Sequence, residues 1–403
     1  MTVMDSSLES ELTAHLHKLS VEIGPRMMGS SADRASAEYI RQVFQNAGLE
    51  VEEQRWDCPY WTVDETVLEL DGQRLPASAN TFSPPCDVSA PMAAVSTMAE
   101  LASAELNGKI GVLYGDLASV PLTAKGYTIY NPERDQRINA LLEAKQPAAL
   151  LTLEPTSRIY EPLIQDRDLP IPSATVTHEV GLRLLAGIGQ IARLKIVSHR
   201  QLSSSANIIG RTASSGKPRI VLCAHYDTKR DTPGTVDNGA GSAALLALAN
   251  RLAKSKTDME FIAFGGEEYY ASGDVEYARR NEGKFGQILA AINMDGIGQR
   301  LGSNTITMMS HSEAFRSLAE ESVRQYPGIV WTQPWPASNH YTFYSRGVPS
   351  IALTSNGLAS ILHRPTDTIE WVSAAKLAEV MLLVMDIVER IHDKSLHWTR
   401  NSI

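Results

Sequence analysis

Short apolar runs alternate with helical segments in the second half of the chain, and this alternation constrains the fold more than any other feature. The runs are rich in branched and aromatic residues, which is typical of buried strands. They lie at residues 219–224, 261–264, 288–292 and 351–353. Helical patterns lie between and after them, at about 243–253 and 374–392. This alternation predicts an α/β fold whose sheet is covered by helices on both faces.

Acidic residues and histidines lie at the carboxyl ends of these runs. A histidine and an aspartate follow the first run, a pair of glutamates follows the second, and an aspartate follows the third. A further aspartate lies on the turn that opens the helix after the first run, and a histidine lies on the loop after the last run. In chain order they are His225, Asp227, Asp237, Glu267, Glu268, Asp295 and His363. Because ligands of open α/β sheets collect at the carboxyl ends of the strands, we expect these side chains to meet.

Five of these residues match the requirements of a site for two metal ions. Zinc binds His nitrogen and Asp or Glu oxygen, and a catalytic zinc keeps one position open for water. Two ions about 3.5–4 Å apart also need a carboxylate that bridges them. We interpret Asp237 as this bridge. His225 and Asp295 then complete the ligands of one ion. Glu268 and His363 complete those of the other.

The two remaining acids have roles beside the metals. Glu267 is left free as a general base, and Asp227 can orient His225 from behind, which fixes the tautomer of the ring. Taken singly, none of these residues is specific: an aspartate after a strand is usually a helix cap, and adjacent glutamates usually face solvent. The ordered set of five ligands and one base is far more specific than any single member.

The motifs that contain these residues resemble the co-catalytic zinc aminopeptidase family, which also contains glutamate carboxypeptidases. They are HYD at 225–227, DNGAG at 237–241, GGEE at 265–268, NMDGIG at 293–298 and LHRPTDT at 362–368. Similar flanking segments are IGPRMMGSSADRASAEYI at 23–40, SANIIGRT at 205–212 and SNHYTFYSRGVPSIAL at 338–353. The resemblance covers about residues 23–49 and 204–372. It implies a mixed β-sheet flanked by helices, two Zn²⁺ ions per chain held by the five ligands above, and Glu267 as the base.

Residues 56–197 interrupt this pattern. They combine short strands, many turns and frequent prolines, without a dense cluster of metal-binding residue types. NGKIGVLYGD, LLEAKQPAALLTL and LPIPSATVTHEVGLRLL resemble parts of a protease-associated domain. We therefore expect a catalytic domain of residues 1–55 and 198–403, with a smaller β-rich domain inserted at 56–197. We also expect the inserted domain to restrict the site to short peptides.

Two positions depart from the family's usual pattern. Asn339 stands before the histidine of the SNH segment, where similar proteins usually carry aspartate. The segment from Tyr269 to Asp274 replaces a run of the Gly-Leu-x-Gly-Ser type after the paired glutamates. Neither departure removes a proposed ligand, and both concern the surroundings of the substrate.

The resemblance predicts an exopeptidase, and within that class an aminopeptidase that acts on peptide substrates. In this interpretation zinc-bridged hydroxide attacks the terminal peptide carbonyl while Glu267 shuttles the proton. A carboxypeptidase or amide hydrolase on the same site is the alternative, with Lys229 and Arg230 as candidates to bind a substrate carboxylate. A catalytically inactive binding protein on the same fold is a remote alternative, because such receptors lose ligands. Deacylase-like peptidases use a similar ligand set, but the ten residues from Asp227 to Asp237 favour the aminopeptidase family.

Composition and charge exclude several other classes. The net charge of −9 argues against a nucleic-acid partner, and no apolar stretch is long enough to span a membrane. The three cysteines show no CxxC spacing, which argues against a cysteine zinc site. The acidic start, MTVMDSSLESEL, lacks the features of a signal peptide, so the sequence as it stands predicts a cytoplasmic protein, or a secreted one if a signal was removed. The sequence assigns neither a preferred terminal residue nor an oligomeric state.

Overall fold

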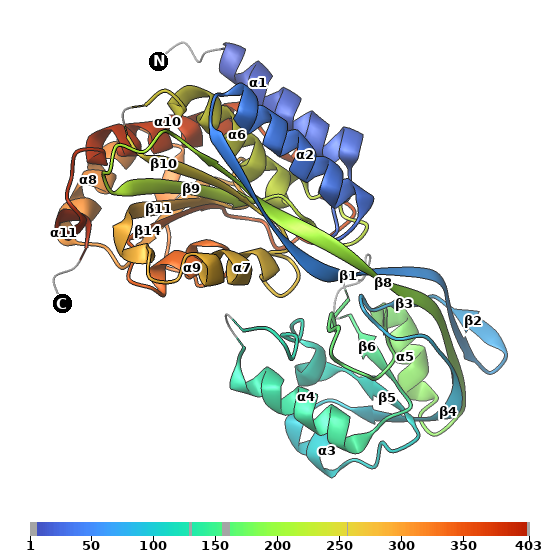
Figure 1. Cartoon of the computed structure of the whole chain (residues 1–403). Helices are drawn as coiled ribbons and strands as arrows, with labels where there is room; N and C mark the ends of the chain where they lie inside the picture. Colours follow the sequence, from blue (N-terminus) through green and yellow to red (C-terminus); the bar gives the residue numbers. More distant parts are fainter. Residues whose placement is uncertain (1–5, 129–130, 155–161, 256, 401–403) are drawn as a thin grey trace. The chain divides into compact units, whose positions relative to one another are not determined.

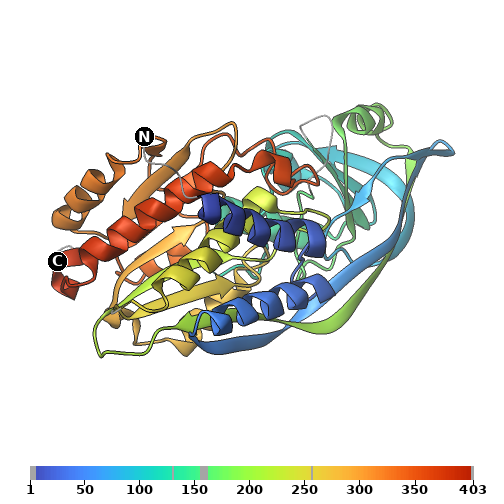
Figure 2. The same cartoon turned by 90° about the horizontal axis from the view of Figure 1, so that it is seen from above.

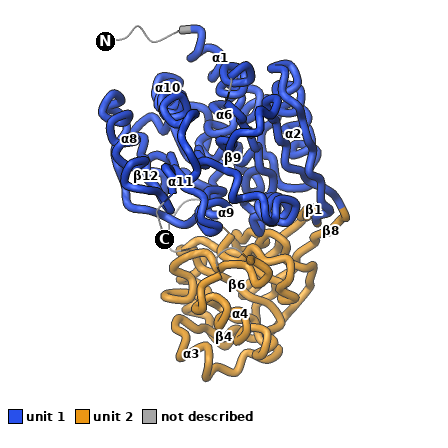
Figure 3. The backbone as a smooth tube through the Cα atoms, turned by 60° about the vertical axis from the view of Figure 1, so that its left-hand side comes forward, with its two compact units in different colours: residues 1–58, 203–403 blue, residues 59–202 orange. Residues whose placement is uncertain are grey.

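The chain divides into two compact units in the computed structural model, which describes residues 6–128, 131–154, 162–255 and 257–400. Unit 1 comprises Met1–Cys58 and Ser203–Ile403, and unit 2 comprises Pro59–Leu202 (Figure 3). Two strands of 21 residues, β1 (Glu50–Leu70) and β8 (Ile191–Arg211), carry the chain from unit 1 to unit 2 and back. Residues 1–5 of the acidic start lie outside the described residues. None of the described helices combines the length and the hydropathy needed to cross a membrane.

Unit 1 contains a mixed β-sheet, as the sequence predicted. Its strand order is β13-β12-β14-β11-β9-β10-β8. The parallel centre consists of β9 (Arg219–His225), β10 (Met259–Phe264), β11 (Ile288–Met294) and β14 (Ser350–Ser355). β8 pairs antiparallel with β10, and β12 (Asn304–Met309) pairs antiparallel with β14 and parallel with β13 (Ile329–Trp331). The four central strands therefore present their carboxyl ends at one edge of the sheet.

Helices cover both faces of this sheet (Figures 1 and 2). One face packs on α1 (Ser6–His17), α2 (Ser31–Asn46), α6 (Ala240–Leu252), α8 (Glu313–Val323) and α10 (Ala374–Ile391). The other face packs on α7 (Ser272–Arg280) and α9 (His340–Tyr344). Leu222 of β9 belongs to the first core, and Val221 and Cys223 belong to the second. Because successive side chains of a strand point to opposite faces, an unbroken apolar run is what a sheet buried on both sides requires.

Unit 2 has its own strands, helices and core. β4 (Cys86–Val95), β5 (Ile110–Leu113), β6 (Ala149–Leu153) and β7 (Ser173–Val176) pair in parallel, and β3 (Ser78–Ala79) pairs antiparallel with β7. The helices of the unit are α3 (Met98–Ser103), α4 (Glu133–Lys145) and α5 (His178–Ala186). β1 turns back into β2 (Gln73–Leu75) through Asp71-Gly72, a residue pair that favours a tight hairpin turn.

Candidate metal centre

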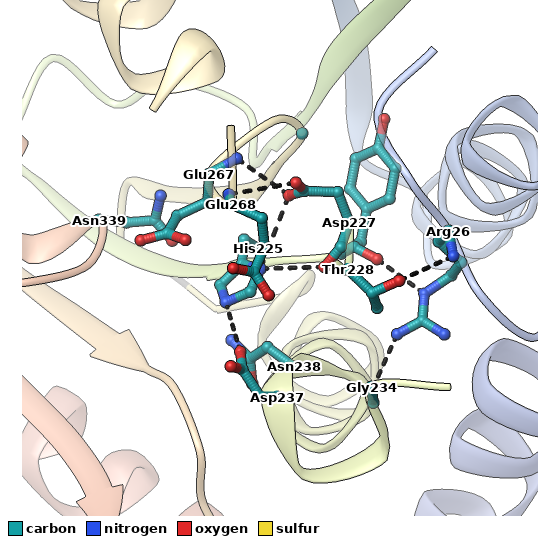
Figure 4. A network of polar contacts seen from close by, with 12 residues as sticks. Arg26, His225, Asp227, Thr228, Gly234, Asp237, Asn238, Glu267, Glu268 and Asn339 are labelled. Atoms are coloured by element: carbon teal, nitrogen blue, oxygen red, sulfur yellow. Dashed lines mark hydrogen bonds and ion pairs between the residues drawn. The ribbon is translucent and has the colours of Figure 1, made fainter. Parts of the chain in front are cut away.

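The predicted site residues come together at the carboxyl ends of the central strands of unit 1. His225 is the last residue of β9, the paired glutamates follow β10, and Asp295 follows β11. Asp237 lies on the short helical turn η3 (Thr235–Gly239) ahead of α6, and its peptide bond to Asn238 is cis. His363 lies on the loop after β14. Figure 4 shows His225, Asp227, Asp237 and the two glutamates around one space.

The first group of potential metal ligands contains His225, Asp237 and Asp295. His225 Nε2 lies 3.1 Å from Asp237 Oδ1 and 3.3 Å from Asp295 Oδ1. The potential ligand atoms of the group all lie within 4.8 Å of one another. The histidine and Asp237 are buried, and Asp295 is half-buried.

The second group contains Asp237, Glu268 and His363. His363 Nε2 lies 3.2 Å from Asp237 Oδ2 and 3.3 Å from Glu268 Oε2. Asp237 therefore turns one carboxylate oxygen to each histidine, which is the geometry that a bridging carboxylate needs. Within the described part of the chain, these two groups are the only sets of three or more acids, histidines and cysteines that meet in this way.

Asp227 holds the paired glutamates in place. Its carboxylate accepts hydrogen bonds from the backbone N–H groups of Glu267 and Glu268, at 3.0 and 3.2 Å. One of its oxygens also lies 3.6 Å from His225 Nδ1, and its backbone carbonyl lies 3.2 Å from the same nitrogen. Asp227 thus contacts both the first histidine and the loop of the glutamates, so the orienting role proposed for it extends to a second element.

The charges of the site are strongly coupled. Burial raises the pKa of Asp237, but hydrogen bonds from the two histidines outweigh burial and hold this pKa well below its usual range. Burial raises the pKa of Glu267 well above its usual range, and the neighbouring carboxylates raise it further. The pKa of His225 is raised despite burial, because the carboxylates of Asp295 and Glu267 favour its charged form. Several buried carboxylates that lie close together require a positive charge nearby.

This donor set fits zinc. Each group offers one imidazole nitrogen and two carboxylates, the ligand types that zinc takes in catalytic sites. Three protein ligands per ion leave a coordination position for water or substrate. Glu267 belongs to neither group, so its carboxylate stays available for proton transfer.

Lys229, a candidate to bind a substrate carboxylate, and His340, the histidine of the SNH segment, both have protein partners in the structure. Lys229 Nζ donates to the carbonyl oxygen of Glu268 at 2.5 Å and lies 3.4 Å from its Oε2. His340 is fully buried; its Nε2 lies 2.8 Å from the carbonyl of Trp335, and burial lowers its pKa to about 4. The lysine therefore supports a proposed ligand, and His340 has a structural position.

The two departures from the family pattern contact each other. Asn339 Nδ2 donates to Asp274 Oδ2 at 2.7 Å, and Thr342 Oγ1 donates to Asp274 Oδ1 at 2.6 Å. Asp274, Asn339 and Thr342 are all buried, so the two departures meet in one buried hydrogen-bonded contact.

Sequence reasoning missed two buried charged residues that support the site, Arg26 and Asp367. Asp367 accepts hydrogen bonds from the backbone N–H groups of Val236 and Asp237, at 2.8 and 3.0 Å. Both residues lie within motifs that carry the family resemblance, IGPRMMGSSADR and LHRPTDT. Each is a charged residue inside a family motif, and neither had been given a role in binding metal or substrate. That combination was the signal that could have identified them.

Comparisons with known proteins find a peptidase family and several aminopeptidases similar to this chain. Residues 207–388 match the model of peptidase family M28. Aminopeptidase YwaD of Bacillus subtilis (strain 168) is 26% identical over 388 residues, which cover 92% of this chain and 82% of that protein. The probable lipoprotein aminopeptidase LpqL of Mycobacterium tuberculosis is 25% identical over 285 residues, which cover 66% of this chain and 54% of that protein.

Solved structures share the fold over almost the whole chain. BSAP, a zinc aminopeptidase from Bacillus subtilis, superposes with a TM-score of 0.78 at 22% identity and covers 98% of each chain. An aminopeptidase from Aneurinibacillus sp. strain AM-1 superposes with a TM-score of 0.76 at 22% identity, covering 99% of this chain and 95% of that one. The family match covers residues 207–388, the similarity to YwaD and the shared fold extend over almost the whole chain, and together they agree with the resemblance to zinc aminopeptidases seen in the motifs.

Proposed function

We propose that this protein is a zinc-dependent aminopeptidase that releases N-terminal residues from peptides, with two zinc ions bound to each chain. The observation that carries the proposal is the position of Asp237, whose two oxygens face two different histidines at 3.1 and 3.2 Å. A carboxylate between two ligand groups is what a pair of metal ions requires. The relatives named above as aminopeptidases support the choice of reaction.

The residues would divide between the ions as the two groups do. His225 and Asp295 would hold one ion, Glu268 and His363 the other, and Asp237 both. Bound zinc ions would polarise the scissile carbonyl and lower the pKa of a coordinated water.

Glu267 is the proposed general base. Its backbone is fixed by Asp227, it lies outside both ligand groups, and burial raises its pKa. A carboxylate with a raised pKa can accept a proton from the attacking water and hold it until the leaving amine needs it.

The acidic character of the site favours a substrate with a free α-amine. Asp237, Glu267, Glu268 and Asp295 create a negative field, which attracts an ammonium group and repels a carboxylate. The carboxypeptidase alternative needs a cation for the substrate's carboxylate. Lys229, one of its candidates, lies beside Glu268 instead.

The test compares three substrates that share the same first residue. They are an aminoacyl amide, its N-acetyl derivative, and an N-acetyl dipeptide with a free carboxylate. We expect turnover of the free amine only, its loss with a zinc chelator, and its return when zinc is added. Equal turnover of the acetylated substrates would overturn the aminopeptidase assignment in favour of the carboxypeptidase or amidase. Full activity after removal of all metal would overturn the zinc mechanism.

A further inference from the structure

Arg26 is a fully buried arginine that contacts several backbone segments at once. It lies on the loop between η1 (Lys18–Ile23) and α2, and its side chain is 0% exposed. Its guanidinium donates to the carbonyls of Leu19, Gly24, Tyr226, Pro233 and Gly234, at 2.7–3.0 Å. Its backbone N–H also donates to Thr228 Oγ1 at 2.8 Å (Figure 4).

These acceptors belong to the two loops that carry His225 and Asp237. Tyr226 directly follows the first histidine, and Gly234 lies three residues before the bridging aspartate. The second loop is tightly packed at Gly234, whose φ is +55°. A Cβ at this position would lie 2.5 Å from the carbonyl oxygen of Asp237. Small movements of this loop therefore move the bridging carboxylate.

Asp367 contacts the same loop through hydrogen-bond acceptors, whereas the guanidinium of Arg26 supplies donors. Asp367 is fully buried, and its two oxygens accept the N–H groups of Val236 and Asp237 at 2.8 and 3.0 Å. Thr235 also donates to the backbone carbonyl of Asp367, through its N–H at 3.3 Å and its Oγ1 at 3.2 Å. Since Asp367 is four residues from His363, it joins the loop of the second histidine to that of Asp237.

We propose that Arg26 and Asp367 are positioning residues that act as a two-sided clamp on residues 233–237, and that this clamp sets the zinc affinity of the protein. Arg26 binds the carbonyls of the loop and Asp367 binds its N–H groups. The inference rests on the proposed function for its metal, but it assigns new roles to residues outside the ligand set.

The chemistry of the guanidinium explains why this position needs arginine. Its planar fork directs N–H donors in several fixed directions, whereas a lysine ammonium is a single point on a flexible stem. Burial lowers the pKa of Arg26 to about 10, and the charges of Asp367, Asp227 and Asp237 oppose this effect, so the side chain stays charged at neutral pH. The clamp thus places a permanent positive charge behind an acidic site.

Zinc affinity of the purified full chain tests the clamp, with three variants measured by competition against a chelator. Arg26→Lys keeps the charge and loses the fork, and Asp367→Asn keeps the size and loses one acceptor. Arg34→Lys is the matched control, because Arg34 lies in the same segment and donates to the carbonyl of Gly29 and to Ser203, away from both loops. We expect the two clamp variants to bind zinc about 10–100-fold more weakly, the usual effect of partners that orient ligands, and the control to bind within about twofold of the parent.

Thermal unfolding of the zinc-depleted proteins and activity at saturating zinc separate positioning from general stability. A positioning role predicts that excess zinc restores most of the turnover. A merely structural role predicts a lower melting temperature with unchanged zinc affinity of the folded protein, and that result would overturn the clamp. If Arg26→Lys does not fold, the zinc affinity of Asp367→Asn alone tests the clamp. If the parent chain itself binds no zinc, the proposed function fails rather than the clamp.

Discussion

The two ligand groups share Asp237 but differ in burial and support. The first uses residues at strand ends, and its histidine, His225, is 1% exposed. The second uses a loop histidine, His363, which is 32% exposed and has a φ of +59°. Its other partner, Glu268, is almost as buried as His225. One histidine is therefore fixed by the sheet, and the other depends on how its loop is held.

This difference has a consequence for metal binding. A ligand held in place before the metal arrives loses little freedom on binding, whereas a loop ligand must be ordered. Asp227 contacts the ring of His225, while Asp367 joins the loop of His363 to that of Asp237. We therefore expect the first group to hold its ion more tightly than the second.

The largest effect should come from the residue that the two groups share. Asp237→Asn removes a charge from both groups, so we expect zinc content to fall from about two ions per chain to less than one and activity to fall to background. The control is Asp231→Asn, an aspartate 69% exposed on the preceding loop, which should keep zinc and activity. Metal analysis after gel filtration measures the content. A single tightly bound ion that survives in Asp237→Asn would show that Asp237 is not shared.

The next effect separates the adjacent glutamates. Glu267→Gln should retain both ions and lose about 10²–10⁴-fold in kcat, the usual contribution of general acid–base catalysis. Glu268→Gln preserves side-chain size in the same way but should also weaken the second group, because a neutral amide is a poorer ligand than a carboxylate. Zinc content and steady-state kinetics measure both effects. If Glu267→Gln loses metal and Glu268→Gln keeps it, the two roles are reversed.

A smaller effect should distinguish the two histidines directly. His363→Asn should release one ion and leave the second bound, whereas His225→Asn should disturb the more buried group and lower stability as well. In the parent protein, slow titration with a chelator should remove zinc in two steps. The first step should leave a chain with one ion that His363→Asn reproduces. Removal of both ions in one step from the parent, with equal losses in the two variants, would contradict the difference between the groups.

The smallest effect concerns Asp274, whose charge interacts with His225 of the first group and with Asp227. Burial raises its pKa to about 6, so the folded protein holds a proton that the unfolded chain has already lost between about pH 4 and pH 6. Its contribution to stability is therefore present at low pH and lost as the pH rises through about 6. From about pH 4.5 to 7 the parent should lose about 2 kcal/mol of unfolding free energy relative to Asp274→Asn. Unfolding of both proteins in chelator across this range measures the change, and parallel curves would contradict it.

The central strands were predictable from the sequence because they are buried on both faces. Their apolar runs end in polar residues, so the order of the motifs also predicted which side chains would meet. The roles of these side chains stay predictions until metal and variants are measured. The α/β class and the mixed sheet are confirmed.

The long strands β1 and β8 were not predicted over their full length, and there is a physical reason. Neither strand keeps one burial pattern over its length. β8 alternates at 191–198, is exposed at 199–202 and is buried at 205–210, and β1 contains Pro59, a residue unfavourable for strands. We expected an inserted domain at 56–197, and the structure divides at Cys58 and at Leu202, within these two strands. Its resemblance to a protease-associated domain and its effect on peptide length stay predictions.

The support of the site could not be derived from residue types. Arg26 binds backbone carbonyls and Asp367 binds backbone N–H groups, and these partners exist at every position of a sequence. Only the path of the chain shows which ones meet. The contact between Asp274 and Asn339 was hidden in the same way, although each residue was noticed as a departure from the family pattern.

A crystal structure of the zinc-loaded protein, with anomalous difference maps on both sides of the zinc edge, tests the central claim most directly. The two-group account predicts two zinc peaks, one beside His225 and Asp295 and one beside Glu268 and His363, with one oxygen of Asp237 toward each. It also predicts that partial chelation weakens the second peak first. A single peak, or two peaks of which only one contacts Asp237, would contradict the account.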